Sequence, residues 1–353
     1  MRFGVLYNID YHESVHGSAS QYYGAILDQI VALEQLGYDS VWFGEHHYAK
    51  YSFGSPVAMV VAAAGRTSRI RLGTGVSLLP LHHPLRLAEE YAMADVLSGG
   101  RLEYGIGRGF LKSAYDLFGI DTEESNRRYR EGAEVLLTAW RSAGRKFDTE
   151  GEFFAMRGAE LFPPPIQQPH PPVYASGAAT LDNYLWAARH GLNLATAFFL
   201  PRQDFVRDAI AQYRATLADH GFDPATREVL GVIQMYCAKT NEEAAHRGWE
   251  FTQNYLRFFS GLDSANPHQA DAYGAYRHRG SGRSMGDMSY ERFDQSNLSL
   301  IGDPERVIAK LHWIQDYYQP DGLLLEVAQG GVPPDMVTPI CERFARHVMP
   351  LFR

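Results

Sequence analysis

The chain has 353 residues, and its 33 Lys and Arg against 41 Asp and Glu give a formal net charge of −8 at neutral pH. Such a chain has no positive field to hold a nucleic-acid backbone or an anionic membrane surface, so neither is an expected partner. The 45% hydrophobic and 21% charged shares are those of an ordinary globular protein. This length accommodates two domains or one large α/β barrel.

Cysteine content and apolar runs bear on where the protein works. Only two cysteines occur, Cys237 and Cys341, too few for a disulfide framework or a thiolate metal site. The sequence opens directly into a strand-like run at 3–7, with no basic leader before it. No apolar run approaches the roughly 18 residues that a membrane helix needs. We therefore expect a cytoplasmic protein with no membrane anchor.

Short apolar runs alternate with longer segments of helical period along the chain, which is the pattern of βα units around a parallel sheet. The predicted strands are Phe3–Asn8, Asp39–Phe43, Ile70–Ser77, Leu102–Ile106, Val173–Ser176, Asn193–Phe198, Val229–Ala238 and Gly322–Val327. The predicted helices are Gln21–Leu36, Pro56–Thr67, Pro84–Leu97, Thr122–Trp140, Leu181–His190, Phe205–His220, Glu242–Phe259, Asp303–Tyr318 and Met336–Met349. This alternation favours a single (β/α)8 TIM barrel over residues 1–353; the alternative is an open Rossmann-like sheet with a second domain.

Two segments interrupt the alternation, one after the fourth predicted strand and one after the seventh. Residues 144–171 are rich in aromatic residues and proline, which predicts a surface excursion with a short hairpin. Residues 260–299 have no period, and long aperiodic segments in barrels are either functional lids or disordered. We expect both segments to be insertions on the barrel.

In a TIM barrel the active site is built by residues that directly follow the strands. Glu45, His46 and His47 follow the second predicted strand. Adjacent residues at a strand end point to opposite sides, so we expect no metal on this histidine pair. Imidazole titrates near neutral pH and suits a general base or a hydrogen-bond donor. The alternative is a structural histidine bonded to a neighbouring carbonyl.

Two further strand ends carry groups suited to a phosphate. Arg108 lies between two glycines after the fourth strand, where its guanidinium could fork onto a phosphate and the bare backbone lets a ligand approach. The alternative is an arginine paired with a surface carboxylate. The small-residue loop 176–180 opens a helix whose free N–H groups favour an anion. Thr180 and Asn183 add donors there, although Thr180 could serve only as an N-cap.

Several motifs recur together, in a fixed order and spacing. They are Trp42-Phe43-Gly44-Glu45-His46-His47, Gly65-Arg66-Thr67, Leu72-Gly73-Thr74, Leu79-Pro80, His83-Pro84, Gly99-Gly100-Arg101-Leu102 and Gly107-Arg108-Gly109. This series resembles bacterial luciferase and the luciferase-like flavin monooxygenases. The resemblance is close over about residues 36–132, recurs at 172–191 and is weaker at 301–350.

The resemblance implies a barrel that binds FMN, usually as reduced flavin (FMNH2) from a separate NAD(P)H-flavin reductase, with O2 as co-substrate and a C4a-peroxyflavin as the oxygenating species. It implies that His46 is essential to the chemistry and that His47 lies on the flavin and substrate side. Arg108 would bind the FMN phosphate. The expected cofactor contacts are completed by Glu45, Gly75, Val76, Gly109, Phe110, Ser176, Ala179, Thr180 and Asn183. Gly75-Val76 matches a position where the family often has a non-prolyl cis peptide.

The resemblance therefore predicts an FMN-dependent monooxygenase that oxygenates a small, largely apolar molecule such as an aldehyde, ketone or terpenoid. Tyr7 and Phe110 are the expected walls of the substrate cavity. The chain has Gly107 where the luciferase alpha chain has a reactive cysteine, so that thiol is not required here. Two alternatives remain open, a deazaflavin (F420)-dependent hydride-transfer oxidoreductase and a flavin-binding protein without turnover.

The family also implies a dimer, here a homodimer, formed through the second and third helices. The small residues Ala58, Ala62, Ala63 and Ala64 would permit close helix packing at such an interface. A buried core would show the same pattern.

Overall fold

Eight parallel strands close into a barrel in a computed structural model that describes residues 1–47, 52–177, 180–264 and 287–353, with only the backbone over 259–264. Around the barrel the strands follow in the order β1 (Arg2–Tyr7), β2 (Ser40–Phe43), β3 (Arg71–Leu78), β4 (Leu102–Gly107), β7 (Val173–Gly177), β8 (Asn193–Ala197), β9 (Val229–Cys237) and β11 (Gly322–Glu326), which returns to β1. The prediction of a TIM barrel is confirmed, and each predicted strand corresponds to one barrel strand.

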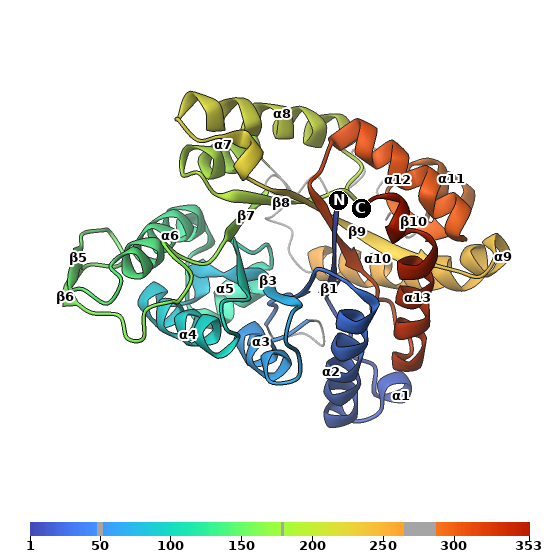
Figure 1. Ribbon diagram of the computed structural model, residues 1–353, viewed down its shortest axis with the longest axis horizontal. Coiled ribbons are helices and arrows are strands. Elements are labelled where there is room, and N and C mark those ends of the chain that lie inside the picture. The colour runs from blue at the N-terminus through green and yellow to red at the C-terminus, as the bar shows by residue number, and fades with distance from the viewer. Residues whose placement is uncertain (48–51, 178–179, 265–286) are drawn as a thin grey trace.

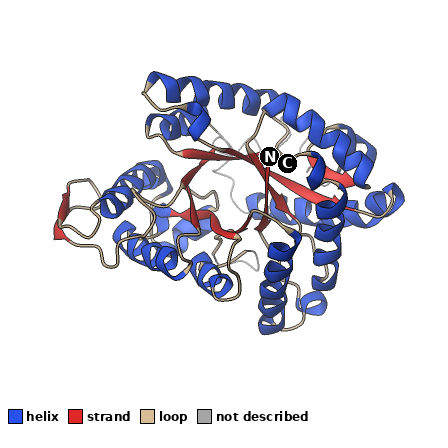
Figure 2. Ribbon diagram, in the orientation of Figure 1, coloured by secondary structure: helices blue, strands red, loops and turns tan. Residues whose placement is uncertain are grey.

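Helices surround this barrel on its outside (Figures 1 and 2). The longer ones are α2 (Ala19–Leu36), α3 (Pro56–Ala64), α4 (Pro84–Leu97), α6 (Ser125–Arg141), α7 (Leu181–Arg189), α8 (Gln203–Asp219), α10 (Trp249–Ser264), α12 (Pro304–Tyr318) and α13 (Pro334–His347). Shorter ones are α1 (Glu13–His16), α5 (Lys112–Phe118), α9 (Asn241–Glu243) and α11 (Tyr290–Gln295), with a π-helical turn at Ala244–Gly248. The chain ends meet, because the amino group of Met1 donates to the carbonyl of Phe352 at 2.8 Å.

Alternation along the strands separates two apolar layers. On β1, Phe3, Val5 and Tyr7 face the helices, whereas Leu6 points into the barrel. The interior is filled by one layer of buried side chains, namely Leu6, Trp42, Tyr174, Ala195, Leu230 and Leu324. This layer blocks the barrel, so any site lies above or below it.

Ion pairs occupy the amino-terminal end of the barrel. Arg2 donates to Glu103 at 2.7 Å, and Arg71 donates to the same carboxylate at 2.6 Å. Glu103 is 1% exposed, so this charge is buried between two guanidinium groups that compensate it. Because these ion pairs fill the amino-terminal end of the barrel, we expect the active site at the carboxyl ends of the strands.

The two insertions are only partly as expected. Residues 144–171 contain the antiparallel hairpin of β5 (Phe147–Thr149) and β6 (Met156–Ala159), which confirms the predicted hairpin. Within 260–299, residues 265–286 lie outside the described part of the chain, so the expected lid cannot be placed. The prediction of an aperiodic segment is wrong at both of its ends, since α10 runs on to Ser264 and α11 with β10 (Ser299–Gly302) occupies the other.

Tertiary contacts explain the carboxyl end of that insertion. β10 pairs in parallel with the second half of β9, from Gln234 to Cys237. Asp294 of α11 is 3% exposed and forms an ion pair with Lys310 of α12 at 2.6 Å. A short helix and strand held by distant partners carry too weak a local pattern to be recognised in sequence. Among the described residues, no helix combines the length and apolarity needed to cross a bilayer.

Candidate active site

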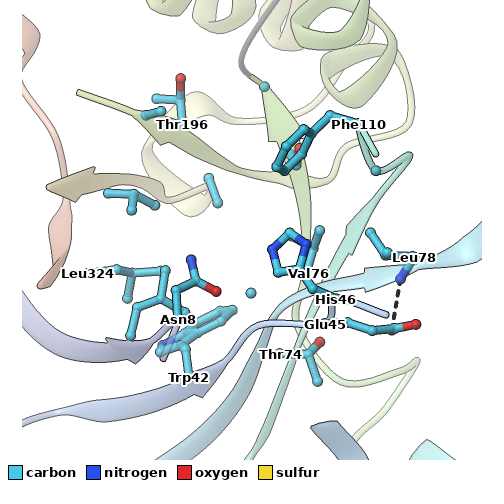
Figure 3. A pocket seen from close by; sticks show the side chains of 18 of the residues that line it. Asn8, Trp42, Glu45, His46, Thr74, Val76, Leu78, Phe110, Thr196 and Leu324 are labelled. Carbon is cyan, nitrogen blue, oxygen red and sulfur yellow. Dashed lines mark hydrogen bonds between the residues drawn. The ribbon is translucent and has the colours of Figure 1, made fainter. Parts of the chain in front are cut away.

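A cavity opens at the carboxyl ends of the barrel strands, above the interior apolar layer. It measures about 1190 Å³ when its open mouth is included. Leu6, Trp42 and Leu324 form its floor, and polar side chains from several strands stand around it (Figure 3). This is the position at which TIM barrels place their active sites.

His46 follows β2 and points into this cavity (Figure 3). Its ring meets that of Phe110 edge to face, with 5.5 Å between the centroids. Burial lowers the pKa of His46 to about 3. The imidazole is therefore neutral at neutral pH, with one ring nitrogen that donates a hydrogen bond and one that accepts.

Glu45, one residue earlier, is a buried carboxylate with four hydrogen-bond partners. One oxygen accepts from His47 at 2.8 Å and from His82 at 2.5 Å. The other accepts from the Ser77 hydroxyl at 3.3 Å and from the Leu78 amide at 3.0 Å. Burial alone would raise the pKa of Glu45, but these hydrogen bonds outweigh it and lower the pKa to about 2. Glu45 is thus a fixed negative charge beside His46.

The donor atoms of Glu45, His47 and His82 lie within 4.8 Å of one another, a grouping that could hold a metal ion. The sequence argument considered each pair of adjacent histidines by itself, His46-His47 and His82-His83, and did not anticipate that His82 would group with Glu45 and His47 from a different strand. Burial lowers the pKa of His82, but the hydrogen bond and charge of Glu45 outweigh that effect and raise it. Because the carboxylate already has both imidazoles as partners, the cluster is explained without an ion.

Arg108 stands at the end of β4, on the cavity wall. It carries the one permanent positive charge among the described residues that line the cavity. Its Nη1 approaches the Ser125 hydroxyl at 3.5 Å, and the Tyr115 hydroxyl donates to its backbone carbonyl. Gly109 has a φ of +81°, in the region that favours glycine. The backbone turn that places Arg108 on the cavity wall therefore depends on a glycine at position 109.

The sheet around this arginine is unusually close-packed. A Cβ at Gly107 would stand 2.3 Å from the Val76 side chain, and one at Gly105 would stand 2.0 Å from the Thr74 carbonyl oxygen. The Gly75–Val76 peptide bond is cis, as the resemblance implied. The cysteine of the luciferase alpha chain could not replace Gly107 unless Val76 moved.

The residues present fit FMN. Arg108, Ser176 and Asn183 bring a guanidinium, a hydroxyl and a carboxamide to one end of the cavity, and this donor set suits a phosphate. The apolar floor suits a planar aromatic ring. Of the expected cofactor contacts, the cavity lining includes Glu45, Gly75, Val76, Arg108, Gly109, Phe110, Ser176 and Asn183.

Three of the predicted site residues lie elsewhere, and Ala179 falls outside the described residues. The prediction that Tyr7 walls the cavity is wrong: its side chain is 0% exposed, and its hydroxyl donates to Gln29 of α2 at 3.1 Å, because strand alternation turns it towards the helices. His47 does not line the cavity, since its ring bonds Glu45. Thr180 is exposed at the N-cap of α7, also off the lining.

Asn8 and Glu326 are among the polar residues of the cavity that the sequence argument missed. Asn8 follows β1 and Glu326 ends β11. The Asn8 amide donates to one oxygen of Glu326 at 2.9 Å. Burial raises the pKa of Glu326 to about 7, against opposing effects of Asn8 and Gln329. Glu326 could have been identified in the sequence, because it directly follows the leucine run 323–325, and residues at the carboxyl end of a barrel strand belong to the active face.

A family model described as luciferase-like monooxygenase matches residues 1–318 of the chain. The flavin-dependent trigonelline monooxygenase, oxygenase component, of Acinetobacter baylyi is 29% identical over 248 residues, 69% of this chain and 67% of that protein. The protein y4vJ of Sinorhizobium fredii is 36% identical over 180 residues, 51% of this chain and 50% of y4vJ. The match thus spans about half the length of that relative.

A solved structure resembles the whole chain. The monooxygenase RslO1 from Streptomyces bottropensis superposes with a TM-score of 0.88 at 28% sequence identity, and the superposition covers 100% of both chains.

Proposed function

The chain belongs to the luciferase-like monooxygenase family, and from that premise we propose that it is the oxygenase of a two-component, FMN-dependent monooxygenase acting on a small, largely apolar organic molecule. The observation that carries the proposal is one cavity in which a phosphate-type donor set, an apolar floor and the neutral ring of His46 face the same space. Reduced FMN, when bound, would supply the electrons that activate O2.

Each part of the wall then has a role. Arg108, Ser176 and Asn183 hold the phosphate group of the cofactor. The apolar side chains of the floor keep water from the reacting centre. His46, neutral because it is buried, donates a hydrogen bond at one ring nitrogen and accepts one at the other. Glu45 fixes the turn that carries His46, because three of its hydrogen bonds, from Ser77, Leu78 and His82, tie the end of β2 to β3 and its following turn.

The test combines the purified protein with FMN, NADH and a generic flavin reductase under ¹⁸O2, with a panel of aldehydes, ketones and terpenes. We expect labelled product from at least one compound and less hydrogen peroxide than the reductase and flavin release alone. Hydrogen peroxide release at the rate of the reductase and free flavin, with every compound, would contradict the proposal. Binding of F420 in preference to FMN would instead favour the hydride-transfer alternative.

The name of the Acinetobacter relative includes "oxygenase component", which supports a separate reductase as partner. The open mouth of the cavity agrees with this proposal, because reduced FMN made by a separate reductase must enter from solution. The expected measurement is a turnover that requires the reductase and NADH together.

A homodimer through α3 and α4 is the second partner that we propose. Ala58 and Ala62 are exposed on α3, and Met93, Val96 and Leu97 are 49%, 39% and 59% exposed on the neighbouring α4. An apolar face of this kind on two adjacent helices suits a self-complementary interface. Sedimentation of the native protein should give twice the chain mass, and Leu97→Arg should shift it to the monomer; a wild-type monomer would contradict the interface.

A further inference from the structure

Buried polar atoms without partners gather around Glu326, which lines one side of the cavity. Glu326 is 3% exposed, and its second oxygen has no hydrogen bond. Gln234 is also 3% exposed, and neither its amide nitrogen nor its amide oxygen has a partner. Gln329, 6% exposed, lies close enough to Glu326 to lower the pKa of that carboxyl, but its amide nitrogen has no partner within hydrogen-bond distance. Folded proteins rarely leave such groups unsatisfied, so each of them calls for an explanation.

These groups lie together because of the register of the strands. Glu326 of β11 is paired with Gln234 of β9, and residues opposite one another on neighbouring parallel strands project to the same face. Glu326 lines the cavity, so Gln234 stands beside it on the interior face. On the other side of Glu326, Asn8 donates to its first oxygen, which orients the second, unpartnered oxygen.

This polar corner is on the far side of the barrel from Arg108. In the closed strand order, three strands separate β4 from β11 in either direction. The residues proposed to hold FMN lie on or after β3, β4 and β7, whereas Gln234 and Glu326 belong to β9 and β11 and Asn8 follows β1. If the phosphate end of the cofactor occupies the first half of the rim and its ring lies on the floor, the wall above the floor in the second half is left for the substrate.

We propose that Glu326, Gln234 and Gln329 form a subsite for a neutral substrate group that both donates and accepts hydrogen bonds, such as a carboxamide or hydroxyl. The assignment rests on the proposed function, and it narrows the substrate class from a plain hydrocarbon or aldehyde to an apolar body with one such group. The Glu326 oxygen accepts from the group, and the amides of Gln234 and Gln329 donate to it. A hydrocarbon would leave all three buried groups unsatisfied, and a carboxylate would meet the Glu326 charge.

The test measures binding rather than turnover, by ligand-observed NMR on the protein with and without FMN. The probes are benzamide, benzyl alcohol, toluene and benzoate, which share one ring and differ in the attached group. We expect benzamide and benzyl alcohol to bind about 5–30 times more tightly than toluene, the range set by one or two net hydrogen bonds. Benzoate should bind no better than toluene above pH 7.

Gln234→Leu removes both amide atoms while keeping the length of the side chain, and it should reduce the benzamide preference over toluene to within about threefold. Gln212→Leu, on the exposed surface of α8, is the matched control and should keep the wild-type preference. Two measurements use only the wild-type protein and so do not depend on the folding of a variant. They are the preference for benzamide over toluene and a benzamide-induced shift of the Glu326 carboxyl infrared band.

Equal binding of benzamide and toluene to the wild-type protein would overturn the subsite. So would a Gln234→Leu variant that binds FMN less tightly but keeps the benzamide preference, because the corner would then belong to the flavin. Loss of the proposed function is distinguishable, since a protein that fails to bind FMN yet prefers benzamide would retain the subsite and lose only the cofactor.

Discussion

Glu326 and Glu45 are two buried glutamates on the same barrel rim with opposite electrostatics. Glu45 has four hydrogen-bond donors around it, and its pKa is lowered to about 2. Glu326 has one oxygen without a partner, and burial raises its pKa to about 7. Replacing Glu326 by the nearly isosteric Gln should therefore change the stability of the protein in a way that depends on pH.

The size of the effect follows from linkage. The pKa of Glu326 rises from 4.5 to about 7 on folding, and each unit is worth about 1.36 kcal/mol. The folded protein holds this proton more tightly than the unfolded chain does, so the stabilisation is complete below pH 4.5 and is lost as the pH rises to about 7. Between pH 5 and pH 8, the wild type should lose about 2.5 kcal/mol that Glu326→Gln retains.

Urea unfolding of the flavin-free protein at pH 5 and pH 8 measures this difference. Glu45→Gln is the matched comparison, since the lowered pKa of Glu45 places its own linkage below pH 4.5. This variant should lose roughly 3 kcal/mol at pH 8, because it breaks buried hydrogen bonds to a charge. It should lose more at pH 5, because Glu45 also raises the pKa of His82 and that stabilisation is present only at the lower pH. A Glu326→Gln variant whose stability relative to wild type is the same at both pH values would refute the reasoning.

Four other substitutions test the site and the strands and helices around it. His46→Ala should slow oxygenation by about 10²–10⁴ while FMN binding stays near normal, measured as turnover and flavin titration; unchanged turnover would remove this ring from the mechanism. Arg108→Ala should weaken FMN binding by roughly 1.5–3 kcal/mol, and an unaltered dissociation constant would mean that it does not touch the phosphate. Gly105→Ala should destabilise the protein by about 1–3 kcal/mol or more, because its Cβ would stand 2.0 Å from the Thr74 carbonyl oxygen. Gly24→Ala, within α2 and with no atom within 4 Å of its Cβ, should instead stabilise it by about 0.5–1 kcal/mol in urea unfolding; a loss there would contradict the packing argument.

The barrel and much of its rim could be read from the sequence because both depend on local signals. Apolar runs separated by helical periods identify the strands, and the rule that sites follow strands selects His46 and Arg108 without any contact being known. The hairpin between β5 and β6 was predictable for the same reason. What failed at this level was the direction of a side chain. Tyr7 ends β1, and strand alternation turns it to the helices, whereas the next residue, Asn8, faces the cavity.

Only the tertiary structure decided which of these groups act together. Glu45 reaches His82 across 37 positions of the chain, and Asn8 reaches Glu326 across 318. No periodicity encodes contacts between strand ends, since they arise when the sheet closes and fixes its register. The closure of the barrel gives Glu45 hydrogen-bond donors on both carboxylate oxygens and leaves one oxygen of Glu326 without a hydrogen bond. The sequence thus supplies two similar carboxylates, and the barrel shifts their pKa values in opposite directions.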